Sequence, residues 1–153
     1  FFLPWFSMLL IGNATTGQVL YRVPLRSGEE FVLAFIHSVN RRPVFDTLRV
    51  VDDHLVIVGS RFDSFGAGMP ESSGPDGTLS MAPDGWLVYR VERPTPEFVV
   101  RVGRVAEHTL HFKGHSIGLA QLAQPGTALR FFVRKCSLVD LIRIRNMPWA
   151  QQE

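Results

Sequence analysis

Apolar and polar residues alternate with a period of two along most of the chain after residue 17. This spacing is typical of strands, because successive side chains of a strand point to opposite faces of the sheet. The first four strand-like segments follow one another closely, so we expect them to form an antiparallel meander. In all, the pattern predicts strands over residues 18–25, 30–39, 44–51, 54–62, 86–92, 98–105, 108–112, 116–122 and 128–135.

Short turn sequences separate these segments, and Lys113-Gly114 occupies the place of a tight hairpin turn. The single helix is predicted near the C-terminus, with Ser137 as its N-cap, Asp140 three residues later, and Met147-Pro148 at its end. Many short strands with one helix predict an all-β fold: an antiparallel β-sandwich or a small β-barrel with a short C-terminal helix.

One long stretch, residues 63–85, shows no periodicity and is rich in glycine and proline. Connections of this length without secondary structure are uncommon in compact domains, and they usually carry function or are disordered. We therefore expect a long loop here.

The first twelve residues, FFLPWFSMLLIG, are almost wholly apolar, although they are too few to span a bilayer as a helix. They fit the remnant of a signal peptide or membrane anchor, a hydrophobic arm, or a buried first strand, and Pro4 disfavours a central strand. We favour the anchor, which would place the domain outside the cytoplasm. The expected organisation is an apolar remnant over 1–12, a β domain over 13–136, and a C-terminal helix and tail over 137–153.

The composition of the chain argues against several classes of function and site. The net charge is only +2, and the basic residues are scattered rather than clustered, so we expect no nucleic-acid partner. The chain has one cysteine, Cys136, which rules out an internal disulfide and a CxxC metal motif.

The stretch FIHSVNRRPVFDTLRV, residues 35–50, brings together residue types that also serve hydrolases. However, adjacent residues of a strand point to opposite faces, so His37 is poorly placed to activate Ser38, and the chain has no GxSxG motif. HxH and HExxH metal motifs are absent as well. We therefore predict no catalytic residue, metal ligand or cofactor. Arg41 and Arg42 either clamp the carboxylate of an anionic small solute or form a solvated turn.

Two stretches, residues 35–50 and SRFDSFGAGMP at 60–70, with AEHTLHF at 106–112 in support, resemble a bacterial domain family of unknown function, family 1850. The resemblance covers residues 17–135. Members of that family are often encoded beside, or fused to, membrane subunits of TAXI-type TRAP solute transporters. The family has Glu more typically where this chain has Asp46. The family pattern falls on His37, Ser38, Val39, Pro43, Val44, Asp46, Phe65, Gly66, Ala67, Gly68 and Pro70.

In an antiparallel meander the second and fourth strands end at the same edge of the sheet, so both motifs are expected to meet at one rim. This patch is either a fixed network, in which Asp46 holds the glycine-rich loop, or a surface for a ligand or partner. Its predicted members are His37, Ser38, Arg41, Arg42, Asp46, Phe65, Gly66, Ala67 and Gly68.

The resemblance implies a non-enzymatic accessory module of a TRAP-type solute transporter that binds the membrane subunits or the solute. We expect it in the periplasm or otherwise outside the cytoplasm, anchored to the inner membrane through its N-terminal segment. One alternative is a β-barrel that binds a small molecule or a metal, with hydrolytic activity at His37 and Asp46. Another is a structural subunit of a different membrane complex, with residues 1–12 as its contact.

Overall fold

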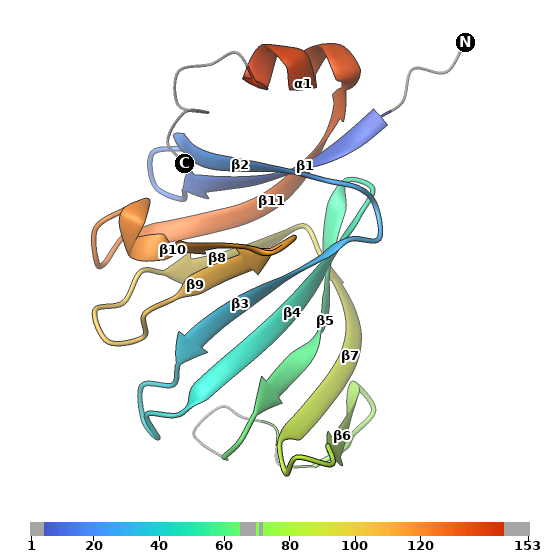
Figure 1. Ribbon diagram of the computed structural model, residues 1–153, viewed down its shortest axis with the longest axis vertical. Helices are drawn as coiled ribbons and strands as arrows, with labels where there is room; N and C mark the ends of the chain where they lie inside the picture. The colour runs from blue at the N-terminus through green and yellow to red at the C-terminus, as the bar shows by residue number, and fades with distance from the viewer. Residues whose placement is uncertain (1–4, 65–69, 71, 146–153) are drawn as a thin grey trace.

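The computed structural model describes residues 5–64, 70 and 72–145 of the chain. Two antiparallel sheets stack to form the domain, and a helix, α1 (Leu138–Arg145), follows the last strand (Figure 1). The first sheet has the strand order β2 (Val19–Leu25), β1 (Trp5–Asn13), β11 (Ala128–Ser137), β8 (Glu97–Arg101). The second has the order β10 (His115–Gly118), β9 (Thr109–Phe112), β3 (Glu30–Ile36), β4 (Pro43–Val51), β5 (His54–Phe62), β7 (Leu87–Thr95), β6 (Gly77–Met81).

This architecture confirms the predicted all-β class with a short C-terminal helix. Both sheets are open within the described residues, so the fold is sandwich-like and not a closed barrel. A short 3₁₀ helix, Leu119–Gln121, lies in the connection between β10 and β11. Among the described residues, no helix combines the length and apolar character that crossing a membrane requires.

The main core lies between the two sheets. Phe31 of β3 and Phe131 of β11 are fully buried and stack with their ring centroids 6.3 Å apart. The rings of Phe98 of β8 and Phe131 form a T-shaped pair with their centroids 6.4 Å apart. Alternate residues of each strand point into this layer, which explains why the period-two pattern was visible in the sequence.

Strand β1 corrects the prediction that residues 1–12 precede the domain. It pairs with β11 on one side and with β2 on the other, so it is central to its sheet. Leu9 and Ile11 belong to the main core, whereas Met8 and Leu10 pack with Phe132 on the opposite face. A strand that is buried on both faces has a continuous apolar sequence. For this reason residues 1–12 resembled a membrane segment. The β domain therefore includes residues 5–12.

The predicted four-stranded meander is correct only for β3, β4 and β5. Strand β2 joins the other sheet, and the turn between Arg26 and Glu29 carries the chain across to β3. The expected 63–85 loop also needs correction, because Gly77–Met81 forms β6 at the edge of the larger sheet.

Two local predictions are confirmed. Lys113 and Gly114 have φ angles of 45° and 78° and join β9 to β10, as expected for a tight hairpin turn. At the start of α1, the Ser137 backbone N–H donates to the Asp140 carboxylate over 3.0 Å, and the Asp140 N–H donates back to Ser137 Oγ over 3.3 Å. This reciprocal capping satisfies backbone donors that a helix N-terminus otherwise leaves open.

Candidate functional site

The predicted rim begins at the turn that follows β3. The Nδ1 atom of His37 accepts the backbone N–H of Val39 over 3.2 Å, and the imidazole is buried. The backbone also closes on itself, because the Arg41 N–H donates to the His37 carbonyl over 3.0 Å. His37 thus stabilises the turn, and this ring nitrogen is occupied rather than free to take a proton from Ser38.

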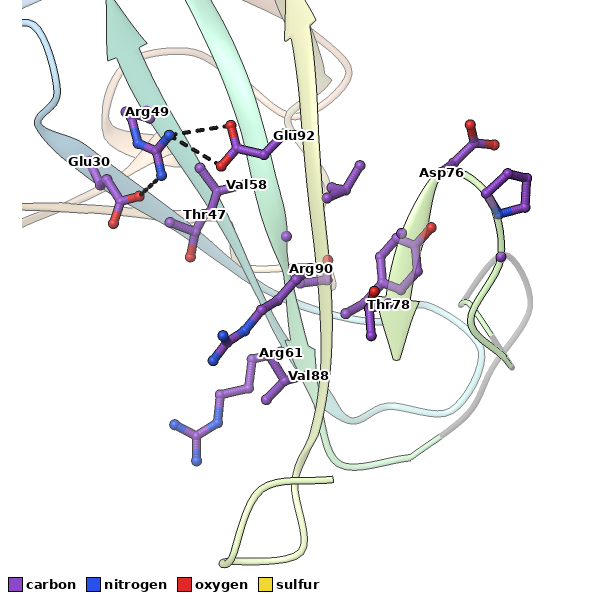
Figure 2. A pocket seen from close by; sticks show the side chains of 17 residues that line it. Glu30, Thr47, Arg49, Val58, Arg61, Asp76, Thr78, Val88, Arg90 and Glu92 are labelled. Carbon is purple, nitrogen blue, oxygen red and sulfur yellow. Dashed lines mark hydrogen bonds and ion pairs between the residues drawn. The ribbon is translucent and has the colours of Figure 1, made fainter. Parts of the chain in front are cut away.

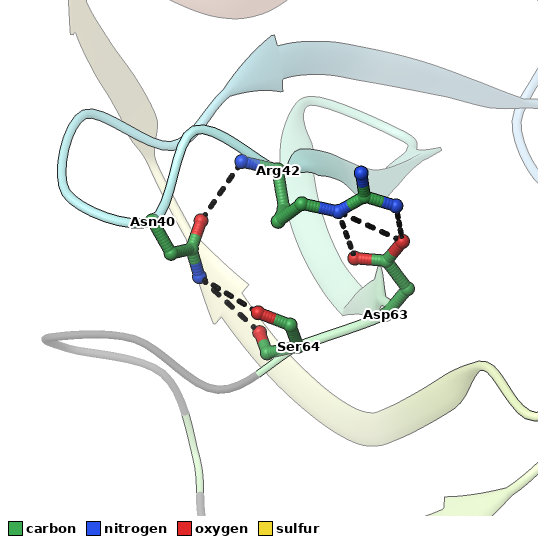
Figure 3. A network of polar contacts seen from close by, with 4 residues as sticks. All are labelled: Asn40, Arg42, Asp63 and Ser64. Atoms are coloured by element: carbon green, nitrogen blue, oxygen red, sulfur yellow. Dashed lines mark hydrogen bonds and ion pairs between the residues drawn. The ribbon is translucent and has the colours of Figure 1, made fainter.

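This turn contacts the residues that follow β5 (Figure 3). The Nε atom of Arg42 lies 3.1 Å from both carboxylate oxygens of Asp63, and a second guanidinium nitrogen completes the ion pair. The Asn40 amide donates to Ser64 over 3.4 Å and accepts the Arg42 N–H over 2.9 Å. The Arg42 guanidinium, as hydrogen-bond donor and positive charge, holds the pKa of Asp63 below its ordinary value.

The predicted members of the patch that the structure describes have different surroundings. Ser38 and Arg41 are exposed on the turn. Phe65, Gly66, Ala67 and Gly68 lie outside the described residues. Because Arg42 is paired with Asp63, it does not form the free two-arginine clamp that we considered for an anionic solute.

Asp46 lies away from the rim, in the interior of β4. It shares the inward face of the strand with Val44 and Leu48, and it sits directly opposite Ser60 of β5. The Ser60 hydroxyl donates to the Asp46 carboxylate. Burial raises the pKa of Asp46, while the hydrogen bond from Ser60 acts in the opposite direction. Among the described residues, the contact of Asp46 is therefore with a neighbouring strand.

Replacement of Asp46 by Asn should raise the free energy of unfolding at pH 7 by about 1 kcal/mol, because the neutral amide avoids burying a charge and still hydrogen-bonds Ser60. A carboxyl whose pKa is raised by folding stabilises the fold below its unfolded pKa of about 4, and this contribution is lost as the pH rises through the folded pKa. Urea unfolding of both proteins at pH 7 and pH 3 checks this, since the difference should shrink at pH 3. A clearly less stable Asn variant at pH 7 would mean that the ionised carboxylate supports the fold.

A groove of about 810 Å³ opens on the outward face of the larger sheet (Figure 2). Three arginines line it. Arg49 is held by two carboxylates, with contacts of 3.4 Å to Glu30 and 3.3 Å to Glu92. Arg61 pairs with Asp84, outside the groove lining, and its guanidinium lies 5.0 Å from the centre of the Trp86 ring. Arg90 projects from β7 without a carboxylate partner among the described residues.

The sequence did not identify this groove, because its residues come from five strands whose pairing cannot be deduced from a local pattern. One signal was present: Gly59 interrupts the strand-like segment 54–62, and an isolated glycine in a strand marks a bulge or a close backbone approach. The register of β5 shifts against β4 and against β7 at this point.

The histidines form no obvious metal site. Within the part of the chain that the structure describes, no three His, Cys, Asp or Glu side chains come close enough together to hold a metal ion. His108 stacks on Phe35 with ring centroids 5.3 Å apart, and burial lowers its pKa. Its Nδ1 atom is buried without a hydrogen-bond partner among those residues. Burial therefore favours the neutral form of the His108 imidazole over the charged form.

Comparison with known proteins gives one result. The family described as "Domain of unknown function (DUF1850)" matches residues 31–119, from β3 to the start of the 3₁₀ helix, which is more than half of the chain. No curated protein and no solved structure shows a significant match. The chain belongs to the DUF1850 family.

Proposed function

We propose that the protein is a non-enzymatic, extracytoplasmic accessory module of a TRAP-type solute transporter, which binds the membrane subunits or the solute. Membership of the DUF1850 family supports this. The link to transporters rests on the resemblance carried by the motifs at residues 35–50 and 60–70, and the periplasmic location follows from the same link.

The observation that carries a binding role is the open, polar groove on the outward face of the larger sheet. Residues of neighbouring strands of the larger sheet line it, and one of its arginines lacks a carboxylate partner among the described residues. The rim polar groups Asn40, Arg42, Asp63 and Ser64, by contrast, contact one another. Ligand sites are concave, and placed polar groups fix the orientation of the ligand in them.

The rim turn is the better candidate for contact with a protein partner. Val39, at its tip, is 67% exposed, so an apolar side chain is available there for contact with a partner. Val99 on β8, 51% exposed in the other sheet, provides a matched control position.

Affinity purification of the tagged, full-length protein from gently solubilised native membranes tests the proposal, with mass spectrometry as the readout. We expect TRAP membrane subunits among the captured proteins. The Val39→Asp variant should recover them at least several-fold less well, because a charge replaces the exposed apolar tip, whereas Val99→Asp should recover them normally. Recovery of the bait alone, with both variants folded, would contradict the accessory role.

A further inference from the structure

The groove contains a row of four residues that lie directly beside one another across four adjacent strands. Thr47 of β4 pairs with Gly59 of β5, Gly59 pairs with Arg90 of β7, and Arg90 pairs with Thr78 of β6. Paired residues of neighbouring strands place their side chains on the same face of the sheet. All four line the groove.

Gly59 leaves a gap in the middle of this row. Since it has no side chain, the groove floor between Thr47 and Arg90 is strand backbone. Thr47 and Arg90 are separated by two strand spacings, or about 10 Å. That interval is wide enough for a carboxylate or phosphate group and the atoms that carry it.

Among the described residues, no side chain competes for the polar groups on the two sides of the gap. Neither the Thr47 hydroxyl nor the Arg90 guanidinium forms a side-chain hydrogen bond or ion pair with the described residues. Figure 2 shows the Arg90 side chain extending on the side of β7 that faces Thr47, whereas the Asp76 carboxylate points away on the other side. A guanidinium presents planar N–H donors that match the oxygens of carboxylate and phosphate groups.

Three arginines and three carboxylates, Glu30, Asp76 and Glu92, line the groove, and the carboxylates are unevenly distributed among the arginines. Arg61 is the diagonal neighbour of Arg90 across β5 and β7, at a typical separation of about 7–8 Å. Asp84 neutralises Arg61 from outside the groove, while Glu30 and Glu92 neutralise Arg49 at the opposite end. Among the described residues, Arg90 is thus the groove arginine without a carboxylate contact, between two arginines that have one. Val58 and Val88 add apolar lining for a short hydrocarbon portion.

From this arrangement we propose that the groove binds a small solute through an oxyanion, a carboxylate or phosphate group, held between Arg90 and Thr47 above Gly59. This deepens the proposed function, on which it rests for the role of the bound solute. The binding itself requires only this chain.

Two-dimensional NMR titration of the purified full-length protein tests the site, with sodium succinate and inorganic phosphate as separate probes at constant ionic strength. Sodium chloride is the matched titration, because exposed charges respond to salt alone. We expect a saturating shift of the Gly59 and Arg90 amide signals with at least one probe and not with chloride. The probe that saturates distinguishes carboxylate from phosphate.

Three variants locate the binding. Arg90→Gln should weaken it about tenfold or more, the scale of losing a charge-assisted hydrogen bond, and Thr47→Val should weaken it a few-fold. Arg93→Gln is the matched control, since Arg93 is an exposed arginine of the same strand that does not line the groove, and it should bind normally. Equal binding by folded Arg90→Gln and wild type, or no saturation of the wild type by either probe, would overturn the proposal. Binding that persists when no transporter subunit is captured would leave the groove assignment standing and reject only the accessory role.

Discussion

Deletion of residues 1–12 should abolish cooperative folding of the domain. The deletion removes nearly all of β1, which lies between β2 and β11, so two strands lose their pairing partner at once. It also removes Leu9 and Ile11 from the main core, both fully buried, and Met8 and Leu10 from the second cluster. Truncation of one buried Leu or Ile to Ala typically costs about 2–5 kcal/mol, and a domain has only about 5–15 kcal/mol in total.

Circular dichroism and urea unfolding of the deleted and complete proteins measure this effect. The deleted protein should show no sigmoidal transition. Removal of residues 1–4 alone is the control, because it leaves every residue of β1 in place, and it should retain the transition. A deleted protein that unfolds cooperatively near the wild-type midpoint would show that β1 is dispensable, and the apolar segment would then be open to a separate role.

The difference between the expected and observed N-terminal segment has a definite physical origin. Hydrophobicity reports that residues are removed from water, and it does not report whether lipid, a helix or a second sheet removes them. Met8 to Ile11 are apolar without alternation because both faces of β1 are covered. The partner that identifies the strand, β11, lies more than a hundred residues later in the chain.

Local signals, by comparison, were sufficient where structure depends on neighbours in sequence. The Lys113-Gly114 turn and the Ser137–Asp140 cap each involve residues within three positions of one another. Alternation correctly located the stretches that became β2 to β5. It could not assign β2 to the other sheet, because side-chain periodicity is the same in either sheet.

The sequence likewise predicted one feature of the candidate site and missed others. The contact between the β3–β4 turn and the residues after β5 agrees with a meander, since both lie at the same edge. The place of Asp46 differs, because its motif position next to the rim did not reveal that its side chain points inward toward Ser60. The row of groove residues from Thr47 to Thr78 could not be predicted from the sequence. It depends on the register of three strand pairs, and two of these pairs contain a bulge.

Those bulges make Gly59 the position where a single methyl group should have a large effect. A Cβ atom added at Gly59 would lie 2.1 Å from the backbone oxygen of Tyr89 and 3.3 Å from the Cα of Arg90. Real Cβ atoms do not approach a backbone oxygen so closely, and neither neighbour is a flexible side-chain end. Strands β5 and β7 would have to separate, which weakens the hydrogen-bonded ladder between them.

We therefore expect Gly59→Ala to lower the free energy of unfolding by about 3 kcal/mol, the upper part of the usual range for overpacking. Gly74→Ala is the matched control, because a Cβ there meets no atom within 4 Å, and its effect should stay within about 0.5 kcal/mol. Urea midpoints at an unchanged m-value measure both. Equal midpoints for the two variants would mean that β7 moves away from β5 at little cost. The groove floor would then be a deformable surface, and the spacing between Thr47 and Arg90 would not be fixed by the fold.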